Sequence, residues 1–250
     1  MKNTASLIIG IVASICFVLA ATAIGGYYYK TKKPQKTISV VGLAEKDFTS
    51  DLIVWTLDYS ALKPTMKEAY STIKEQNKIV KDYLISKGIQ ANEIDFKSVS
   101  ANPDYDGRYE YDANGNSHYV SVFKGYRATQ NIRIESKNVD LVEKVEREVA
   151  ELYDQDINLN SNSPSYYYTK LADLKIKMLE EASKDARNRA QTITKNAGAK
   201  LDGLVNANMG VFQITAPNSS DEDYTWGGAF NTSSKQKRAS INMRLTYEVK

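Results

Sequence analysis

Three kinds of residue in this sequence have side chains suited to chemistry or binding: a lone histidine, a pair of arginines and several tyrosines. A histidine can act as a general acid or base, but the sequence places no serine, cysteine or paired carboxylate to work with His118. Arg187 and Arg189 could bind an anion, whereas Asp185, four residues before Arg189, favours an ordinary ion pair along a helix. We therefore predict no catalytic residue and keep the two arginines as candidate ligand contacts.

Tyrosine is the most unusual component of the sequence, with 17 residues. Tyr105, Tyr109 and Tyr111 fall in a polar segment, and Tyr166 to Tyr168 form an uninterrupted run before a long predicted helix. A tyrosine combines a large contact area with a polar tip, which suits interfaces. These six residues are the candidate interface or ligand contacts, with packing between lobes as the alternative to packing between subunits.

Metal and cofactor chemistry find little support in the sequence. One cysteine, Cys16, and one histidine exclude an intrachain disulfide, a Cys/His zinc cluster and a CxxC redox pair. Residues 112–116 (DANGN) resemble part of a calcium loop, but the glycine comes fourth instead of sixth, which favours a turn. No GxxxxGK[ST], GxGxxG or HExxH motif occurs, so we expect no cofactor and no metal.

The composition is that of a folded globular protein, with 42% hydrophobic and 25% charged residues. The formal net charge is only +3, and the two signs alternate along the chain. No basic tract is present to neutralise phosphates, so we expect no nucleic-acid partner.

The N-terminal region predicts a membrane segment. Residues 5–26 carry no charge, and the apolar run from Leu7 to Ile24 can cross most of a bilayer core. We expect residues 1–29 to be an uncleaved transmembrane signal anchor. The alternative is a signal sequence cleaved at the A-x-A site of residues 21–23, which would give a secreted protein.

Two features disagree about the orientation of this segment. Four lysines follow it within residues 30–36 and only Lys2 precedes it, which by the positive-inside rule places the rest of the chain in the cytoplasm. The absence of cysteine from the globular part favours export instead. We expect a single-pass protein of the inner membrane with its folded domain in the periplasm.

The remaining sequence mixes alternating strands with amphipathic helices. Residues 51–62 alternate with Trp55 on the apolar face, and residues 170–197 predict the longest helix, with alanines at 182, 186 and 190. Asn114-Gly115 predicts a tight turn inside a long hairpin. The absence of regular βαβ repetition indicates an α+β fold with mostly antiparallel sheets, in which residues 37–62 share a sheet with residues 204–249.

Three strings resemble the SIMPL-domain family of exported bacterial proteins: residues 38–45 (ISVVGLAE), 125–130 (GYRATQ), and 181–191 (EASKDARNRAQ) continued by 196–204 (NAGAKLDGL). The resemblance implies an outer SIMPL lobe from residues 37–92 and 170–250. It implies an inserted ferredoxin-like lobe from residues 93–169, and residues 30–36 would be a linker. It implies no catalytic residue.

These observations favour a non-enzymatic protein of the cell envelope. We expect it to act by binding or self-assembly, as a homo-oligomer attached to the membrane through its N-terminal helix. The alternative is a solute-binding protein or enzyme that uses a cleft between the lobes.

Overall fold

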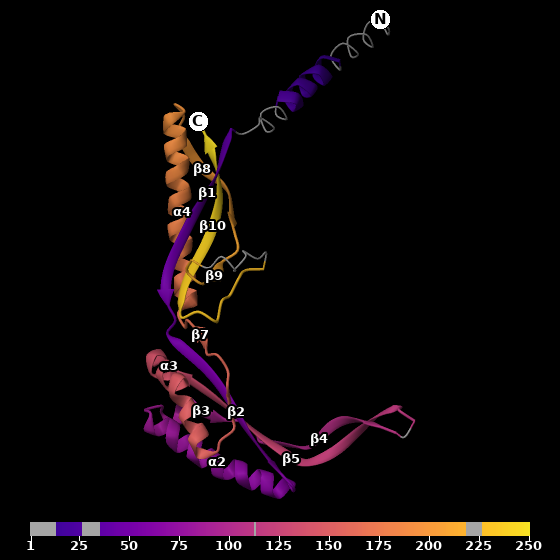
Figure 1. Ribbon diagram of the computed structural model, residues 1–250. Coiled ribbons are helices and arrows are strands. Elements are labelled where there is room, and N and C mark those ends of the chain that lie inside the picture. Colours follow the sequence, from indigo (N-terminus) through magenta and orange to yellow (C-terminus); the bar gives the residue numbers. More distant parts are fainter. Residues whose placement is uncertain (1–13, 27–35, 113, 219–226) are drawn as a thin grey trace, which may run out of the picture. The chain divides into compact units, whose positions relative to one another are not determined.

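The computed structural model describes residues 14–26, 36–112, 114–218 and 227–250 (Figure 1). Residues 14–26 form a helix within the predicted membrane segment. Within the described ranges, no helix combines the length and the apolar character needed to cross a membrane. Residues 7–13 of the predicted span and residues 30–35 of the predicted linker lie outside the described residues, so the anchor stays a prediction.

The described strands form two sheets, whose strand pairings are antiparallel. The first sheet has the order β1-β10-β8, with β9 paired to β10. Its strands are β1 (Thr37–Thr49), β8 (Leu201–Met209), β9 (Gln213–Thr215) and β10 (Gln236–Val249). The second sheet has the order β3-β5-β2-β6, with β4 paired to β5 and β7 to β2. Its strands are β2 (Leu52–Lys63), β3 (Ile94–Phe96), β4 (Ser100–Tyr111), β5 (Ser117–Ser136), β6 (Leu159–Ser161) and β7 (Ser165–Tyr167).

Helices accompany both sheets, which confirms the α+β class. They are α2 (Met66–Ser86), α3 (Val139–Glu148) and α4 (Leu171–Asn196), with the short 3-10 helices η1 (Ala91–Glu93) and η2 (Val149–Gln155). The chain divides into two compact units. Unit 1 contains residues up to Leu43 together with Ala182–Met209 and Met243–Lys250, and unit 2 contains Ala44–Glu181 and Gly210–Asn242.

The predicted sharing of one sheet by residues 37–62 and 204–249 is correct for β1 and wrong for β2. β1 lies beside β10, but β2 pairs with β5 from Ile53 opposite Ser136 to Lys63 opposite Tyr126. The physical reason is that β5 offers β2 a long antiparallel partner with its apolar side chains on the same face. β2 and α2, which the resemblance placed in the outer lobe, therefore belong to the sheet and core that contain β5.

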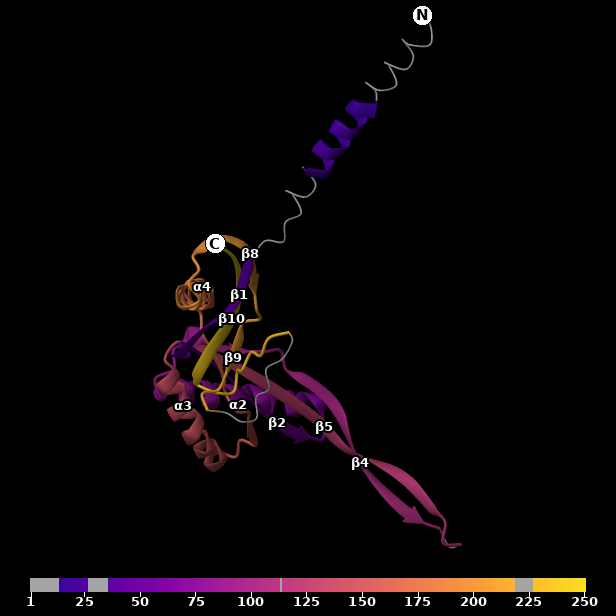
Figure 2. The same ribbon diagram turned by 90° about the horizontal axis from the view of Figure 1, so that it is seen from above.

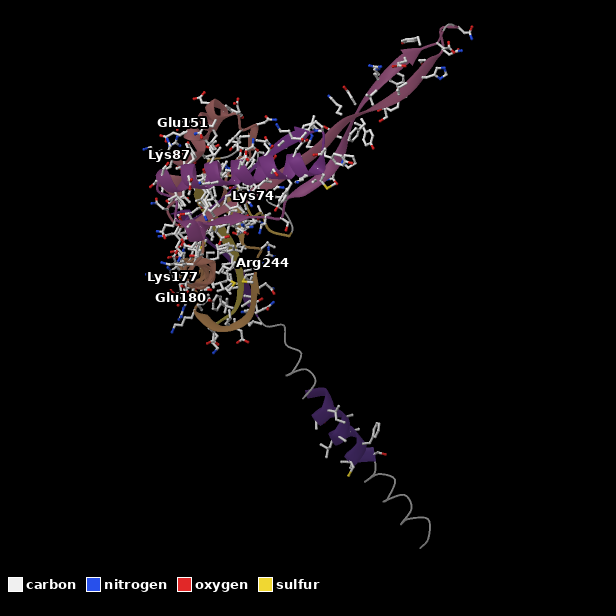
Figure 3. All side chains as sticks on the ribbon, turned by 90° about the horizontal axis from the view of Figure 1, so that it is seen from below. Lys74, Lys87, Glu151, Lys177, Glu180 and Arg244 are labelled. Carbon is white, nitrogen blue, oxygen red and sulfur yellow. The ribbon has the colours of Figure 1, made fainter. Side chains whose placement is uncertain are left out.

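The core of unit 2 follows the period-two pattern read from the sequence. β2 buries alternate residues from Ile53 to Ala61, including Trp55 with no exposed surface, against apolar residues of α2 and α3. α2 begins with a capping box, in which the Thr65 side chain accepts from the Glu68 N–H, and it ends just before Gly88. Lys87, at the end of α2, reaches the Glu151 carboxylate at 2.8 Å (Figure 3).

The core of unit 1 depends on small residues. Ala186 and Ala190 of α4 pack with Val40 of β1 and with Leu245 and Tyr247 of β10. Both alanines and Ala182 have no exposed surface, which confirms the predicted alanine stripe. α4 runs beside this sheet in both Figure 1 and Figure 2.

Candidate functional site

A two-stranded hairpin, made of β4 and β5, extends beyond the rest of the second sheet. Residues Tyr126 to Thr129 of β5 pair with β2 on one edge and with β4 on the other. β2 ends at Lys63, opposite Tyr126, so in the described strands residues 117–125 of β5 pair with β4 alone. We call residues 103–112 and 114–125 the arm; Figures 1 and 2 both show it extending past the ends of β2 and α2.

One face of the arm carries five aromatic side chains, which we call the aromatic strip: Tyr105, Tyr109, Tyr111, Tyr119 and Phe123. Tyr105 lies opposite Phe123, and Tyr109 lies opposite Tyr119. Residues directly opposite each other in an antiparallel pair, and residues two apart along a strand, share a face of the sheet. The strip therefore follows the whole length of the arm beyond Pro103.

The rings of the aromatic strip contact one another across the two strands. Tyr105 and Phe123 have ring centroids 5.5 Å apart in an edge-on arrangement, and Tyr109 and Tyr119 have centroids 5.4 Å apart. Phe123 continues this series to Tyr126, with centroids 5.4 Å apart. Aromatic pairs prefer such tilted contacts, so the rings hold a common surface without a core beneath them.

Gly107 leaves room for this arrangement. A Cβ atom at Gly107 would overlap the ring and hydroxyl of Tyr119. The Tyr119 ring therefore lies across the β4 backbone at Gly107, and a larger residue at position 107 would displace the ring.

The aromatic strip is exposed to an extent that is unusual for large apolar rings. The exposed fraction is 57% for Tyr105, 67% for Tyr109, 75% for Tyr111, 65% for Tyr119 and 47% for Phe123. Contiguous exposed apolar surface is typical of interaction sites. The strip is the largest such set of aromatic rings among the described residues.

On the opposite face of the arm, the β4 side chains are charged and form ion pairs, whereas the β5 side carries Val120 and Val122. Arg108 contacts Glu110 at 2.6 Å, Lys124 contacts Asp106 at 3.3 Å, and the arm residue Asp104 pairs with Arg127 at its base. These exposed pairs contribute little stability each, but they keep this face hydrated. The arm thus has one aromatic face and one face with charged β4 side chains, which we call the ionic face.

The tip of the arm is a turn, as the residue pattern predicted. The Asp112 carboxylate accepts hydrogen bonds from the backbone N–H groups of Asn114 and Asn116 at 2.9 Å, and Gly115 has a φ of 82°. Hydrogen bonds from the backbone and side chain of Asn116 hold the pKa of Asp112 below its usual value. His118 is exposed, with Nε2 3.3 Å from Asp112, and the described residues include no group of three metal-ligating side chains.

Tyr166, Tyr167 and Tyr168 lie in and after β7, and each is half-buried. Tyr166 packs against the core of unit 2, and burial together with a hydrogen bond to Glu143 raises its pKa to about 12. Tyr168 instead contacts Phe48, with ring centroids 4.8 Å apart. The structure therefore separates this run from the arm tyrosines, and Tyr166 acts as a packing residue.

Tyr168 also lines a small pocket in unit 2. Its cavity of about 250 Å³ lies between the end of β1 and the first turns of α4, with Lys46, Lys170, Lys177 and Phe48 in its wall. Asp173 and Glu181 line the same cavity, so both signs of charge surround an aromatic and apolar floor. Figure 3 shows Lys177 on α4.

Arg187 and Arg189 lie on α4 in unit 1, a different compact unit from the tyrosines. Arg189 binds Asp185 at 2.8 Å, which confirms the pair expected from the i,i+4 spacing. Asp185 also accepts a hydrogen bond from the Leu43 N–H at 3.0 Å. This bond lowers the pKa of Asp185 most, and the hydrogen bond and positive charge of Arg189 lower it further. Arg189 thus helps to attach α4 to β1.

Sequence reasoning missed two members of the aromatic strip, Tyr119 and Phe123. Neither is among the predicted contact residues, because nothing in the local pattern links them to the tyrosines of β4. The link is cross-strand register, which places Phe123 opposite Tyr105.

The described residues thus form an α+β fold with an exposed aromatic arm. Residues 38–247 match the SIMPL family, described as proteins of unknown function (DUF541), and the chain belongs to this family. A comparison with curated proteins finds no match.

Proposed function

We propose that this SIMPL-domain protein is not an enzyme and acts by binding or self-assembly through the aromatic strip of the arm. The observation that carries the proposal is the strip itself, with five rings on one face that each expose about half or more of their surface. Tyrosine and phenylalanine rings supply much of the binding energy at protein interfaces. A two-stranded ribbon is only marginally stable in water without further contacts, so a partner would also stabilise the arm.

The cellular setting belongs to the same proposal. The uncharged residues 5–26 anchor the chain in the inner membrane as a single-pass protein, with the folded domain in the periplasm. Secretion after cleavage is the alternative.

We place the start of the ferredoxin-like lobe at β2 instead of residue 93. The βαββαβ order of that fold is matched by β2, α2, β4, β5, α3 and β6. The strands of this set lie in the order β4-β5-β2-β6.

Removal of two rings from the aromatic strip tests the function. We expect Tyr109→Ser combined with Tyr119→Ser to abolish crosslinking of the full chain to its cellular partner, or to a second copy, with a circular dichroism spectrum like that of the wild type. Both rings are exposed, so their loss leaves the core of unit 2 intact.

The matched control is Arg108→Ser combined with Glu110→Ser, which removes an ion pair from the opposite face of the same arm. Crosslinking should persist in the control. Equal loss in both double variants, or no loss in either, would contradict a role for the strip.

A second candidate function is solute binding, and the pocket beside Tyr168 is the observation that favours it. Its volume of about 250 Å³ is slightly below the range usual for small-molecule sites. A solute present at 100 times its dissociation constant would stabilise the protein by ~2.7 kcal/mol, which a thermal-shift screen detects. The absence of any shift with fractionated cell-envelope extract would count against this candidate.

A further inference from the structure

The two edges of the arm differ in how they are protected against pairing with another strand. Natural edge strands avoid such pairing with charged residues, proline or bulges. β4 follows this rule, since Pro103, Asp104, Asp106, Arg108 and Glu110 all lie along it.

The β5 edge lacks this protection. Residues 117–123 (SHYVSVF) contain no proline, no acidic residue, and no basic residue apart from His118. Valine, tyrosine and phenylalanine favour extended structure, and the first charged side chain after this stretch is Lys124. Lys124 lies at a β-bulge, because the register with β4 shifts between Asp104 and Tyr105. The bulge therefore marks the inner limit of an unprotected edge.

This edge is also vacant in the described part of the structure. β4 and β2 occupy opposite edges of β5, because residues 126–129 pair with both. β2 ends at Lys63, so from residue 125 toward the tip the edge on the β2 side has no partner among the described strands. The backbone N–H and C=O groups along this edge pair with no described strand, so they can accept an added strand.

We propose that residues 117–123 of β5 pair antiparallel with the same residues of a second copy of this chain. The inference rests on the proposed function and deepens it by naming the partner. A two-fold axis perpendicular to the sheet would join two arms into four strands. The same operation leaves both aromatic strips on one face, where they form a single larger surface.

Charge favours a second copy as the occupant of this edge. Antiparallel pairing of residues 117–123 with themselves brings no acidic residue and no lysine or arginine into opposition at any register within the stretch. The same pairing of β4 with a second β4, centred on Gly107, would place Asp104 opposite Glu110 and Asp106 opposite Arg108. Two like β5 edges therefore meet no charge repulsion within this stretch, whereas two β4 edges in that register bring like-charged pairs together beside oppositely charged ones.

The test measures the molar mass of the full chain in detergent micelles by light scattering over a concentration series. Val122 and Asp106 lie opposite each other in the arm, so Val122→Lys and Asp106→Asn each raise the net charge by one unit at the same level, on opposite edges. We expect the wild type to dimerise and Val122→Lys to raise the dissociation constant at least about tenfold. Asp106→Asn should change it by less than about twofold.

Crosslinking adds a readout that depends on position. Cys16 is the only cysteine, so Cys16→Ser provides a background for single cysteines at Val120 or Arg108, which also lie opposite each other. A short bismaleimide should produce dimers through Val120→Cys several-fold faster than through Arg108→Cys. Equal rates would overturn the assignment of the β5 edge.

The outcomes separate this inference from the proposed function. A wild-type chain that stays monomeric, or a dimer that tolerates Val122→Lys, overturns pairing through β5. If Tyr109→Ser with Tyr119→Ser still abolishes crosslinking to a cellular partner in that case, the strip retains its role with another protein. If that double variant has no effect either, both proposals fail.

Discussion

Replacement of Trp55 by alanine should lower the free energy of unfolding of unit 2 by about 3–5 kcal/mol, the usual cost of truncating a large buried aromatic side chain. Trp55 has no exposed surface and lies in the core between β2 and the helices of unit 2. Its indole N–H also donates to the Ser161 hydroxyl at 3.1 Å, which ties β2 to β6. Chemical denaturation followed by circular dichroism measures the change.

Tyr70→Ala is the matched control, because Tyr70 is an aromatic residue of the same unit with 53% of its surface exposed. Its replacement should change the free energy of unfolding by less than about 0.5 kcal/mol. A Trp55→Ala midpoint that matches the Tyr70→Ala midpoint would contradict the placement of Trp55 in the core.

Replacement of Gly42 by alanine should destabilise unit 1 by about 3 kcal/mol, at the upper end of the cost of overpacking. The new Cβ would overlap the carbonyl oxygen of Ala182, and it would lie 2.5 Å from the N atom and 2.8 Å from the Cβ of Ala186. Two of these neighbours are backbone atoms of α4, which cannot move by changing a rotamer. The strand and the helix must therefore separate.

Hydrogen exchange resolved by peptide measures this effect within unit 1. Amides of β8 and the end of β10 should exchange faster in Gly42→Ala, whereas amides of β2 and β5 should keep their wild-type rates. Gly203→Ala, in β8, is the control because a Cβ there meets no atom within 4 Å. Similar exchange in both variants would show that β1 and α4 tolerate a larger separation.

The elements that sequence reasoning predicted are those set by local periodicity. The alternation around Trp55, the alanine stripe of α4 and the turn near Gly115 each depend on residues close together in the chain, and each is confirmed. The partner of β2 is set by distant residues. The apolar face of β2 could pack in either sheet, and the length and register of its pairing with β5 decide that β2 joins the second sheet.

The aromatic strip also could not be predicted from local periodicity, because it depends on the register of β4 against β5. A two-residue turn at Asn114-Gly115 would place Tyr109 opposite Val120 and Tyr119 opposite Glu110. The loop instead closes through the Asp112 N–H and the Asn116 carbonyl, which places Tyr109 opposite Tyr119. A shift of one residue moves a whole strand's side chains to the other face, so the loop length determines whether the tyrosines meet.

A photoreactive phenylalanine derivative placed at Tyr109 in living cells tests the central claim, that the aromatic face of the arm is a contact surface. The same derivative at Glu110, one residue further along β4 and on the ionic face, is the comparison. We predict a specific crosslinked product from position 109, at several-fold higher yield than from position 110. Equal yields from the two positions, or no product from position 109, would contradict the claim.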